Sequence, residues 1–470
     1  MIDTRVTSGS EGLDTVLRGG LPSGNIYLLQ GLPGTGKTTL ALQFLLAGAA
    51  KGEPVLYVTL SQTASDLQRI AASHGWSLDG IVIVELQSET GPEEDAQSIF
   101  QTTDLRLDAT RRAIEAAIVE HDPRRLVYDS LLEVRLLAPD LARYQREMLG
   151  LRTIVSNRDM TVMLLDTVPE AEIKDSQSRG IVDGIITLDK TLPAFGRARR
   201  RIEVAKMRGV DIYDGWHDMD IRTGEGVAVF PRLAPGEKVD RLEGGELIRS
   251  GRDRLDAVFG GGMEPGTTTM VVGQAGSGKS TIASLYATAA LERDEKVALF
   301  LFEERVETFF RRSEGLGMDL RGHHASGRLK IYDFNPDEIT AGEFSQLVQR
   351  EADANDLRVV VIDSFTGYMS ALGNEGRALF DIQALLKHLA YRQVLTFLIV
   401  AQHGLLGENA DVRLDLSFLG DTVLLLRLRE VDGHIHRDLI AVKKRHGPHE
   451  LAVRRLVIET GHVDVSEDDR

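Results

Sequence analysis

GLPGTGKT, residues 31–38, decides the fold of this chain, and GQAGSGKS, residues 273–280, repeats its pattern. Both segments fit G-x-x-x-x-G-K-[ST], in which glycines let successive backbone N–H groups curl around phosphate groups. The helix expected after each loop presents the positive end of its dipole to the anion. Chance does not account for two such segments at equivalent places in one chain, so we predict two phosphate-binding loops.

The residues of each loop have distinct predicted roles. Lys37 and Lys279 are expected to contact the β- and γ-phosphates of a nucleotide. Thr38 and Ser280 are expected to bind Mg²⁺ through their hydroxyl oxygens. ATP and Mg²⁺ are therefore the expected ligands. The predicted nucleotide-binding residues are Gly34, Thr35, Gly36, Lys37, Thr38 and Thr39 in the first loop, and Gly276, Ser277, Gly278, Lys279, Ser280 and Thr281 in the second.

The two loops belong to a tandem repeat. Residues 10–45 and 252–287 share a Leu-Asp pair, Gly-Gly, Pro, Gly, an apolar run, the loop and a helix-like segment. The spacing of the loops matches the size of a whole domain. Residues 231–251, rich in Pro, Gly and charge, mark the boundary. We predict domains at residues 1–235 and 252–470, joined by a linker at 236–251.

Short apolar runs follow each loop and predict the strands of a sheet. Most of them lack alternation between apolar and polar residues, which is typical of strands buried on both faces of a parallel sheet. Helix-like segments such as 110–121 and 376–393 separate several runs. Each copy is therefore predicted to be an α/β domain with a mostly parallel, twisted sheet flanked by helices. The runs are 54–60, 80–86, 124–130, 161–167 and 184–190 in the first copy, and 296–302, 328–334, 358–364, 396–402 and 422–428 in the second.

An aspartate followed by serine ends one apolar run in each copy. These residues, Asp129 and Asp363, stand where a strand-end carboxylate can hold Mg²⁺ directly or through water. The alternative is that each aspartate caps the following turn. Because the Asp-Ser pair recurs in both copies, we predict the metal role.

Composition excludes several classes of site. The chain contains no cysteine, which rules out disulfides and thiolate metal sites and fits a reducing cytoplasm. The N-terminal residues lack an apolar segment of signal-peptide length, and no uninterrupted apolar run is long enough to span a membrane. The net charge of −16 argues against nucleic acid as a partner. We expect a cytoplasmic protein that binds neither membranes nor nucleic acid.

The combination of these features resembles the KaiC family of tandem RecA-like P-loop NTPases. The resemblance covers about residues 5–460 and rests on the repeated lead-in, both loops, the Asp-Ser strand ends, Glu303-Glu304 and Lys206-Met207-Arg208-Gly209. It implies a homo-hexameric double ring with ATP between subunits. It also implies that Glu303 and Glu304 activate the attacking water, with one of them dominant.

Further roles follow from the same resemblance. Lys206 and Arg208 in the first copy, and Lys443 and Arg445 in the second, would contact the γ-phosphate held by a neighbouring subunit. The alternative for the glutamate pair is a solvated helix start, where acidic side chains complement the dipole. The alternative for Lys206 and Arg208 is a solvent-facing strand edge.

The chain also departs from the family pattern. Ser61 and Gln62 stand in the first copy where the second has Glu303 and Glu304. The family carries a Ser-Thr phosphoacceptor pair before an Asp-Thr strand start. Here the corresponding residues are Ser417 and Phe418, so Ser417 is the candidate phosphoacceptor. The second basic motif reads Lys443-Lys444-Arg445-His446. We also expect that a long regulatory C-terminal tail, which the resemblance to the family would imply, is absent or minimal.

We therefore expect an ATP-hydrolysing ring protein, with serine autokinase activity as an additional hypothesis. Hydrolysis is expected mainly in the second copy, because Ser61 and Gln62 cannot accept a proton from water as a carboxylate can. Two alternatives remain: a slow-turnover, nucleotide-gated signalling scaffold, and a DNA-directed RecA-like ATPase. Besides other copies of this chain, signalling or clock-type proteins are candidate partners. Gln402 and His403 are candidate γ-phosphate sensors, the alternative being a polar pair at a strand end.

Overall fold

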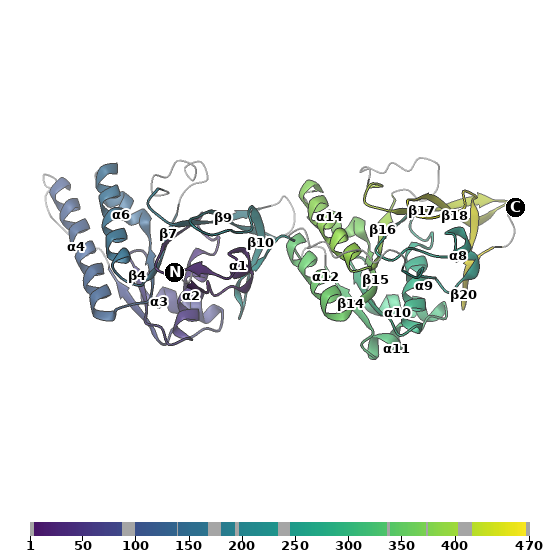
Figure 1. Cartoon of the computed structure of the whole chain (residues 1–470), viewed down its shortest axis with the longest axis horizontal. Helices are drawn as coiled ribbons and strands as arrows, with labels where there is room; N and C mark the ends of the chain where they lie inside the picture. The colour runs from purple at the N-terminus through teal and green to yellow at the C-terminus, as the bar shows by residue number, and fades with distance from the viewer. Residues whose placement is uncertain are drawn as a thin grey trace. The chain divides into compact units, whose positions relative to one another are not determined.

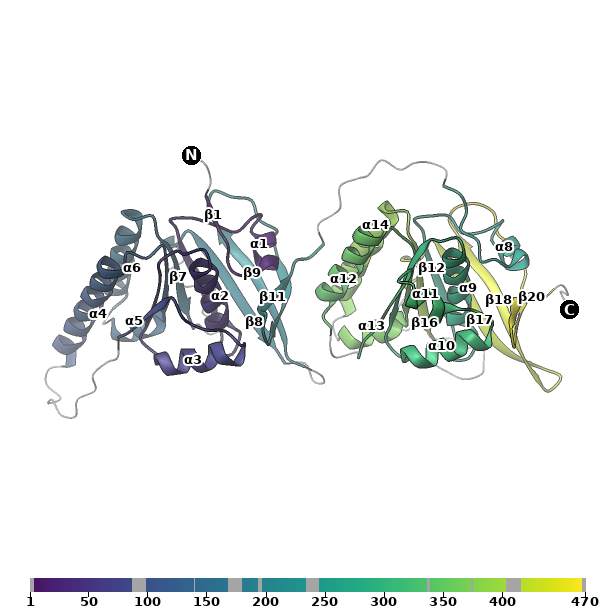
Figure 2. The same ribbon diagram turned by 90° about the horizontal axis from the view of Figure 1, so that it is seen from below.

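The computed structural model divides the chain into two compact units, Met1–Arg232 and Leu233–Arg470. Figures 1 and 2 show the secondary structure of each unit, which is described separately below. The structure describes residues 4–86, 99–138, 140–167, 180–192, 197–233, 245–335, 339–372, 375–402 and 416–466.

The first unit is built on a nine-stranded sheet with the order β11-β10-β9-β8-β3-β7-β6-β4-β5. The strands from β8 to β5 are parallel, whereas β8, β9, β10 and β11 pair with one another in antiparallel fashion. The short strands β1 (Arg5–Val6) and β2 (Leu21–Pro22) form a separate pair. The strands of the large sheet are β3 (Ile26–Gly31), β4 (Val55–Thr59), β5 (Ile81–Glu85), β6 (Arg125–Asp129), β7 (Thr161–Asp166), β8 (Gly184–Thr191), β9 (Arg199–Met207), β10 (Trp216–Arg222) and β11 (Gly226–Phe230).

Helices cover both faces of this sheet. Leu29 on one face packs in a cluster with Phe44 of α2, whereas its neighbour Leu28 on the other face joins Ile118 of α4 and Met148 of α6. Because successive strand residues point to opposite faces, both faces need apolar side chains. The helices are α1 (Glu11–Val16), α2 (Lys37–Ala49), α3 (Ala64–Ser73), α4 (Ile99–His121), α5 (Leu131–Leu137) and α6 (Leu141–Ser156).

The second unit repeats this architecture. Its sheet has the order β14-β13-β15-β16-β12-β17-β18-β19-β20, which matches the first sheet strand for strand. Its strands are β12 (Thr268–Gly273), β13 (Lys296–Leu301), β14 (Leu329–Asp333), β15 (Leu357–Asp363), β16 (Leu395–Ala401), β17 (Thr422–Val431), β18 (His434–Lys444), β19 (Arg454–Glu459) and β20 (His462–Val465). Its helices are α8 (Asp253–Val258), α9 (Lys279–Glu292), α10 (Val306–Gly315), α11 (Leu320–Ala325), α12 (Ala341–Asn355), α13 (Phe365–Leu372) and α14 (Glu375–Tyr391).

The second core also has two halves. Tyr286 of α9 lies in the cluster on one face of the sheet, and Phe344 of α12 and Ile382 of α14 lie in the cluster on the other. Two mostly parallel sheets flanked by helices confirm the predicted tandem RecA-like fold. No helix in the described parts of the chain is long and apolar enough to cross a membrane.

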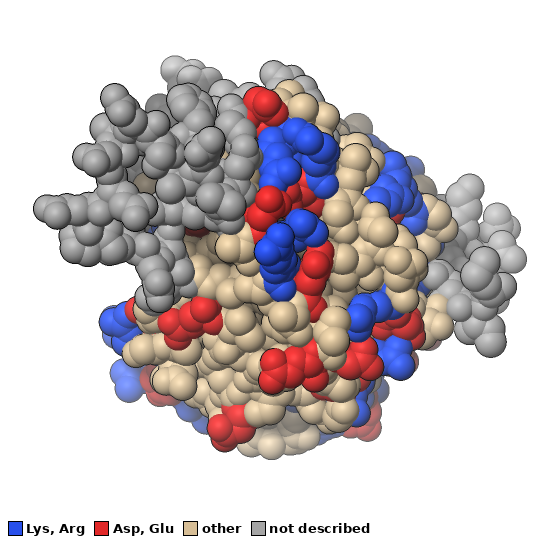
Figure 3. Space-filling view, turned by 90° about the vertical axis from the view of Figure 1, so that its left-hand side faces the viewer, with Lys and Arg blue, Asp and Glu red and all other residues tan. Residues whose placement is uncertain are grey.

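One surface of the first unit carries paired charges. On the α4 side, which Figure 3 faces, basic and acidic side chains alternate along a band. Ion pairs occur here within α4 (Arg111 with Glu115, 2.9 Å), between α4 and α6 (Asp108 with Arg143, 2.7 Å) and within α6 (Arg143 with Glu147, 3.3 Å). Side chains of both signs therefore meet any partner that approaches this face.

Candidate functional site

Both predicted phosphate loops lie between a central strand and a helix. The first joins β3 to α2 and the second joins β12 to α9, at the carboxyl ends of the parallel strands. The last loop residues, Gly36 and Gly278, have φ angles of 109° and 102°, which strongly favour glycine. A Cβ atom at either position would also lie 2.8 Å from an isoleucine side chain, Ile221 or Ile458. The backbone at each helix start therefore requires glycine.

The loop lysines are held against their own loops. Lys37 Nζ donates hydrogen bonds to the carbonyl oxygens of Gly31 (2.6 Å) and Leu32 (3.1 Å). Lys279 Nζ donates to the carbonyl oxygen of Gln274 at 2.7 Å. Burial lowers the pKa of both lysines, and nearby carboxylates oppose this shift. Each ammonium group is thus placed at the head of a helix, where an anion would be bound.

In the second unit the predicted metal residues contact each other. The Ser280 hydroxyl donates a hydrogen bond to the partly buried Asp363 carboxylate, whose pKa is raised by desolvation and lowered to a smaller extent by Ser280 and Arg312. Lys279 lies close enough to Asp363 and Glu303 for both carboxylates to raise its pKa against the effect of burial. Lysine, hydroxyl and carboxylate therefore converge at one point.

The first unit contains an additional group at the same place. Tyr57 Oη donates a hydrogen bond to Asp129 Oδ2 at 2.6 Å, and the Thr38 side chain also hydrogen-bonds to this tyrosine. Burial raises the pKa of Asp129, while the hydrogen bond from Tyr57 lowers it. Thr38 and Asp129 are thus linked through a tyrosine, whereas Ser280 and Asp363 make direct contact.

These donor sets fit Mg²⁺. A hydroxyl and a carboxylate are hard oxygen ligands, and Mg²⁺ usually takes few protein ligands and completes its shell with water and phosphate oxygens. Thr38 with Asp129, and Ser280 with Asp363, are the residues that would hold it. No group of three or more His, Cys, Asp or Glu side chains that could hold a metal ion occurs among the described residues.

The two glutamates of the second unit have different surroundings. Glu303 Oε1 accepts a hydrogen bond from Ser364 Oγ at 2.6 Å, and Glu303 is near Lys279. Glu304 forms a bidentate ion pair with Arg312: Nε donates to Oε1 at 3.2 Å and Nη2 donates to Oε2 at 2.8 Å. Both carboxylates lie near the site, because Glu303 raises the pKa of Lys279 and Glu304 raises that of Asp363. The hydrogen bond from Ser364 and the proximity to Lys279 favour Glu303 as the dominant carboxylate, whereas Glu304 is engaged by Arg312.

Ser61 and Gln62 occupy the matching positions in the first unit. The backbone N–H of Leu60 bonds to the Asp129 carbonyl at 2.7 Å, as Phe302 bonds to Asp363 in the second unit. The Gln62 backbone N–H bonds to Thr59 Oγ1 at 3.0 Å, and the buried Gln62 Oε1 has no hydrogen-bond partner within the described part of the chain. The turn at residues 60–63, which the structure describes throughout, therefore supplies no carboxylate.

The predicted trans-acting cations lie at the amino ends of the parallel strands, whereas the loops lie at the carboxyl ends. We call the end that carries Arg208 or Arg445 the arginine edge of each sheet. Arg208 bonds through its backbone to Asp183, which bonds to Ile26 at the start of β3, whereas the loop follows Gly31. Five strand residues separate these levels, or about 16 Å. Arg445, Asp421 and Thr268 repeat the arrangement in the second unit. Within one chain these arginines are remote from the loop of their own domain.

Each cation contacts the segment next to it. Lys206 Nζ donates to the Val182 carbonyl at 2.7 Å, and Arg208 contacts Asp183 at 3.5 Å. Lys443 Nζ donates to the Ser417 carbonyl at 2.9 Å, and Arg445 contacts Asp421 at 3.3 Å. Both arginines are about half exposed, with 48% and 49% of their side-chain surface accessible.

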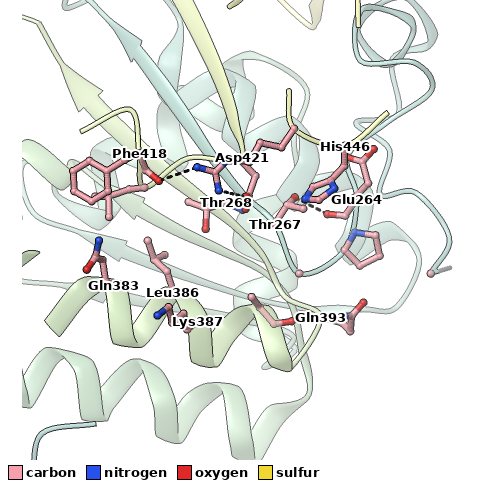
Figure 4. Close-up of a pocket in the computed structure, with 16 residues that line it drawn as sticks. Glu264, Thr267, Thr268, Gln383, Leu386, Lys387, Gln393, Phe418, Asp421 and His446 are labelled. Carbon is pink, nitrogen blue, oxygen red and sulfur yellow. Dashed lines mark hydrogen bonds and ion pairs between the residues drawn. The ribbon is translucent and has the colours of Figure 1, made fainter. Parts of the chain in front are cut away.

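A cavity of about 540 Å³ lies beside Arg445 in the second unit. Figure 4 shows Phe418 and Asp421 on one side, and Gln383, Leu386 and Lys387 of α14 on the other. The candidate phosphoacceptor Ser417 is exposed next to this cavity, and Phe418 is 46% exposed. Arg445, Lys443 and Ser417 therefore lie together at the arginine edge of the second unit.

The remaining sensor candidates have different outcomes. The Gln402 backbone N–H bonds to the Gly273 carbonyl at 2.9 Å, directly before the second loop. His403 lies outside the described residues. No structural result assigns either residue a role, so the sensor hypothesis stays a prediction.

Several residues of the site escaped sequence reasoning. Tyr57 lies inside an apolar run and reads as core. Asp166, buried at the end of β7, pairs with Arg135 and raises the pKa of Lys37 against the effect of burial. Glu133 accepts a hydrogen bond from Ser130 at 2.6 Å. The spacing S-x-x-E was the available signal for Glu133, but it is also typical of a helix cap.

Comparison with known proteins gives matches over nearly the whole chain. The family model for the KaiC ATPase matches residues 6–234 and 248–470. The circadian clock oscillator protein KaiC of Picosynechococcus sp. is 27% identical over 468 residues, covering 98% of this chain and 89% of that protein. The KaiC proteins of Prochlorococcus marinus and Synechococcus elongatus are each 26% identical and cover 97% and 98% of this chain, and 91% and 88% of their own lengths.

Proposed function

Because the chain belongs to the KaiC family of ATPases, we propose that it binds Mg·ATP in both domains and hydrolyses it mainly in the second. One observation carries this proposal: Glu303, held by Ser364, faces the point where Lys279, Ser280 and Asp363 converge. The first domain keeps the loop, the lysine, the hydroxyl and the strand-end carboxylate, so it retains the means to bind the nucleotide.

The proposed reaction is the in-line attack of water on the γ-phosphorus. The loop N–H groups and Lys279 bind the phosphate oxygens, and Ser280 and Asp363 hold Mg²⁺, which neutralises negative charge on the phosphates. Glu303 orients the water and accepts its proton. Ser364 fixes the orientation of Glu303 through the 2.6 Å hydrogen bond. Glu304, paired with Arg312, supports the local structure.

A neighbouring subunit completes the site in this proposal. Arg445 and Lys443 are too far from their own loop to contact its phosphates. At the arginine edge of the sheet, Arg445 is exposed and Lys443 is partly exposed. In a ring, one subunit's edge with Arg445 faces the loop of the next. A cation there stabilises charge that develops in the transition state. Lys206 and Arg208 would act in the same way in the first domain.

Single-glutamine variants test the assignment. Glu303→Gln is expected to lower ATP hydrolysis by the second domain by roughly 10²-fold or more, because general-base assistance contributes about 10²–10⁴ in rate. Glu304→Gln is the matched control, since its carboxylate pairs with Arg312, and we expect less than a tenfold loss. If both variants keep nearly full activity, Glu303 does not activate water and the proposed division between the domains fails.

A second candidate activity is phosphorylation of Ser417. Its supporting observation is that Ser417 is exposed beside Lys443 and Arg445, the groups proposed to meet a neighbour's γ-phosphate. Phe418 cannot accept phosphate, so only one of the two family positions is available. Mass spectrometry after incubation with Mg·ATP should find phosphate on Ser417 and none after Ser417→Ala. Phosphate elsewhere, or no phosphate, removes this activity.

A further inference from the structure

The serine after each strand-end aspartate holds a carboxylate, and the two domains supply that carboxylate from different elements. In the second domain Ser364 Oγ donates to Glu303 Oε1 at 2.6 Å. In the first domain Ser130 Oγ donates to Glu133 Oε2, also at 2.6 Å. The serines are equivalent because β6 and β15 hold the same place in the two sheets and each ends at the aspartate before its serine.

The carboxylate that accepts from the serine comes from a different position in each domain. Glu303 follows β13, and its counterpart in the first domain is Ser61. Glu133 lies in the first turn of α5, three residues after Ser130, and its counterpart three residues after Ser364 is Gly367. Each domain thus has one glutamate and one small residue at these two positions, in opposite order.

The space around Gly367 explains why the exchange is reciprocal. A Cβ atom on Gly367 would lie 3.0 Å from Glu303 Oε1 and 3.2 Å from Ser364 Oγ. A longer side chain at position 367 would therefore compete for the space that holds the Glu303 carboxylate and the Ser364 hydroxyl. In the first domain such a side chain is present, and the residue at the position of Glu303 is the short Ser61.

Geometry places Glu133 beside the strand-end aspartate of the first domain. Ser130, whose hydroxyl donates to Glu133, directly follows Asp129 at the end of β6. Glu133 is partly exposed, and its second oxygen, Oε1, has no hydrogen-bond partner among the described residues. The same holds for Glu303 Oε2. Each glutamate is thus anchored through one oxygen and can bind water through the other.

We propose that Glu133 is the catalytic carboxylate of the first domain, which therefore contributes its own, smaller share of ATP hydrolysis. This inference rests on the proposed ATPase function. Water held by Glu133 attacks the γ-phosphorus, the bond to the bridging oxygen breaks, and ADP leaves with that oxygen. Glu133 accepts the water proton and passes it to phosphate or solvent, so ATP and water give ADP and phosphate.

The test silences the second domain of the full-length protein with Lys279→Ala and Glu303→Gln together. The turnover that remains should fall roughly a hundredfold when Glu133→Gln is added. Binding of a fluorescent ATP analogue to the first domain should stay within about twofold. Glu120→Gln, on the exposed part of α4, is the control and should leave the remaining turnover unchanged.

A transplant separates catalysis from helix capping. Glu133→Gly in the same background should lose the remaining turnover, and Glu133→Gly with Ser61→Glu should restore it, because the carboxylate then comes from the position of Glu303. A capping role predicts no such recovery. The inference is overturned if Glu133→Gln leaves turnover unchanged, if the silenced background shows no turnover, or if a folded, nucleotide-binding transplant stays inactive. Wild-type protein that hydrolyses no ATP would instead refute the proposed function itself.

Discussion

At the scale of single residues, the strand-end aspartates link the chemistry of the site to stability. Burial raises the pKa of Asp363, so the folded state disfavours its ionised form. The free energy of unfolding therefore falls as the pH rises from the usual carboxyl range through the raised pKa. A bound cation would favour the ionised carboxylate and so offset this loss of stability. Groups that destabilise the empty protein but serve its function are common at functional sites.

Asp363→Asn should consequently stabilise the protein without nucleotide and abolish its response to Mg·ATP in the second domain. If the ionised carboxylate costs about 1 kcal/mol, the melting temperature at pH 8 should rise by about 2–4 °C. The gain should shrink at pH 5, where wild-type Asp363 is more fully protonated. Differential scanning calorimetry at both pH values checks this, with the exposed Asp333→Asn as control. A variant less stable at pH 8 than at pH 5, relative to wild type, would contradict the sign.

At the scale of elements, helix α2 packs against a buried arginine of strand β6. Arg125, at the start of β6, has no exposed side-chain surface and pairs with Glu53 at 2.5 Å. Its guanidinium also donates to the carbonyl oxygens of Thr7 and Phe44, both at 2.8 Å. Gly48 of α2 leaves room for this side chain, because a Cβ atom there would lie 2.6 Å from Arg125 Nε.

Gly48→Ala should therefore destabilise the first domain by about 1–3 kcal/mol through overpacking, although alanine favours helices. Gly150→Ala in α6 is the matched control, since a Cβ atom there meets nothing within 4 Å. It should stabilise the protein by about 0.5–1 kcal/mol. Urea unfolding of both variants measures the difference. Equal effects of the two substitutions would show that Arg125 does not restrict position 48.

The elements also show what sequence patterns could reveal. The loops and the parallel strands were predictable, because the glycine-lysine spacing is typical of a phosphate loop and unbroken apolar runs are typical of buried strands. The antiparallel strands β9 and β18 were harder to delimit, since they are only partly buried and mix charged with apolar residues. Tyr57 and Glu133 were missed because their roles depend on contacts between elements, and locally they resemble a core residue and a helix cap.

At the scale of the whole molecule, the arginine edge and the phosphate loop of each sheet lie too far apart to share one nucleotide. If subunits complete each other's sites, two inactive variants should complement one another. Lys279→Ala disables a loop and Arg445→Ala disables an edge. In mixed rings an intact loop then meets an intact edge at about a quarter of the head-to-tail interfaces when equal amounts mix at random.

The mixture should therefore recover about a quarter of the second-domain turnover, above the level of either variant alone. Native mass spectrometry with Mg·ATP should show hexamers for the wild type and the mixture. Mixing Lys279→Ala with wild type at the same ratio controls for dilution. Hexamers that regain nothing on mixing would mean that Arg445 does not act on a neighbour's nucleotide.

The exchange between positions 61/133 and 303/367 also constrains the history open to this gene. Position 367 cannot gain a long side chain while Glu303 keeps its present rotamer, and Ser61→Glu in the presence of Glu133 would bring two carboxylates to one hydroxyl. Two like charges at one hydrogen-bond donor repel each other. Each substitution is thus harmful or favourable according to whether the other has already occurred. If both glutamates are catalytic as proposed, no single substitution converts one domain's arrangement into the other's, because the conversion needs a change at both positions.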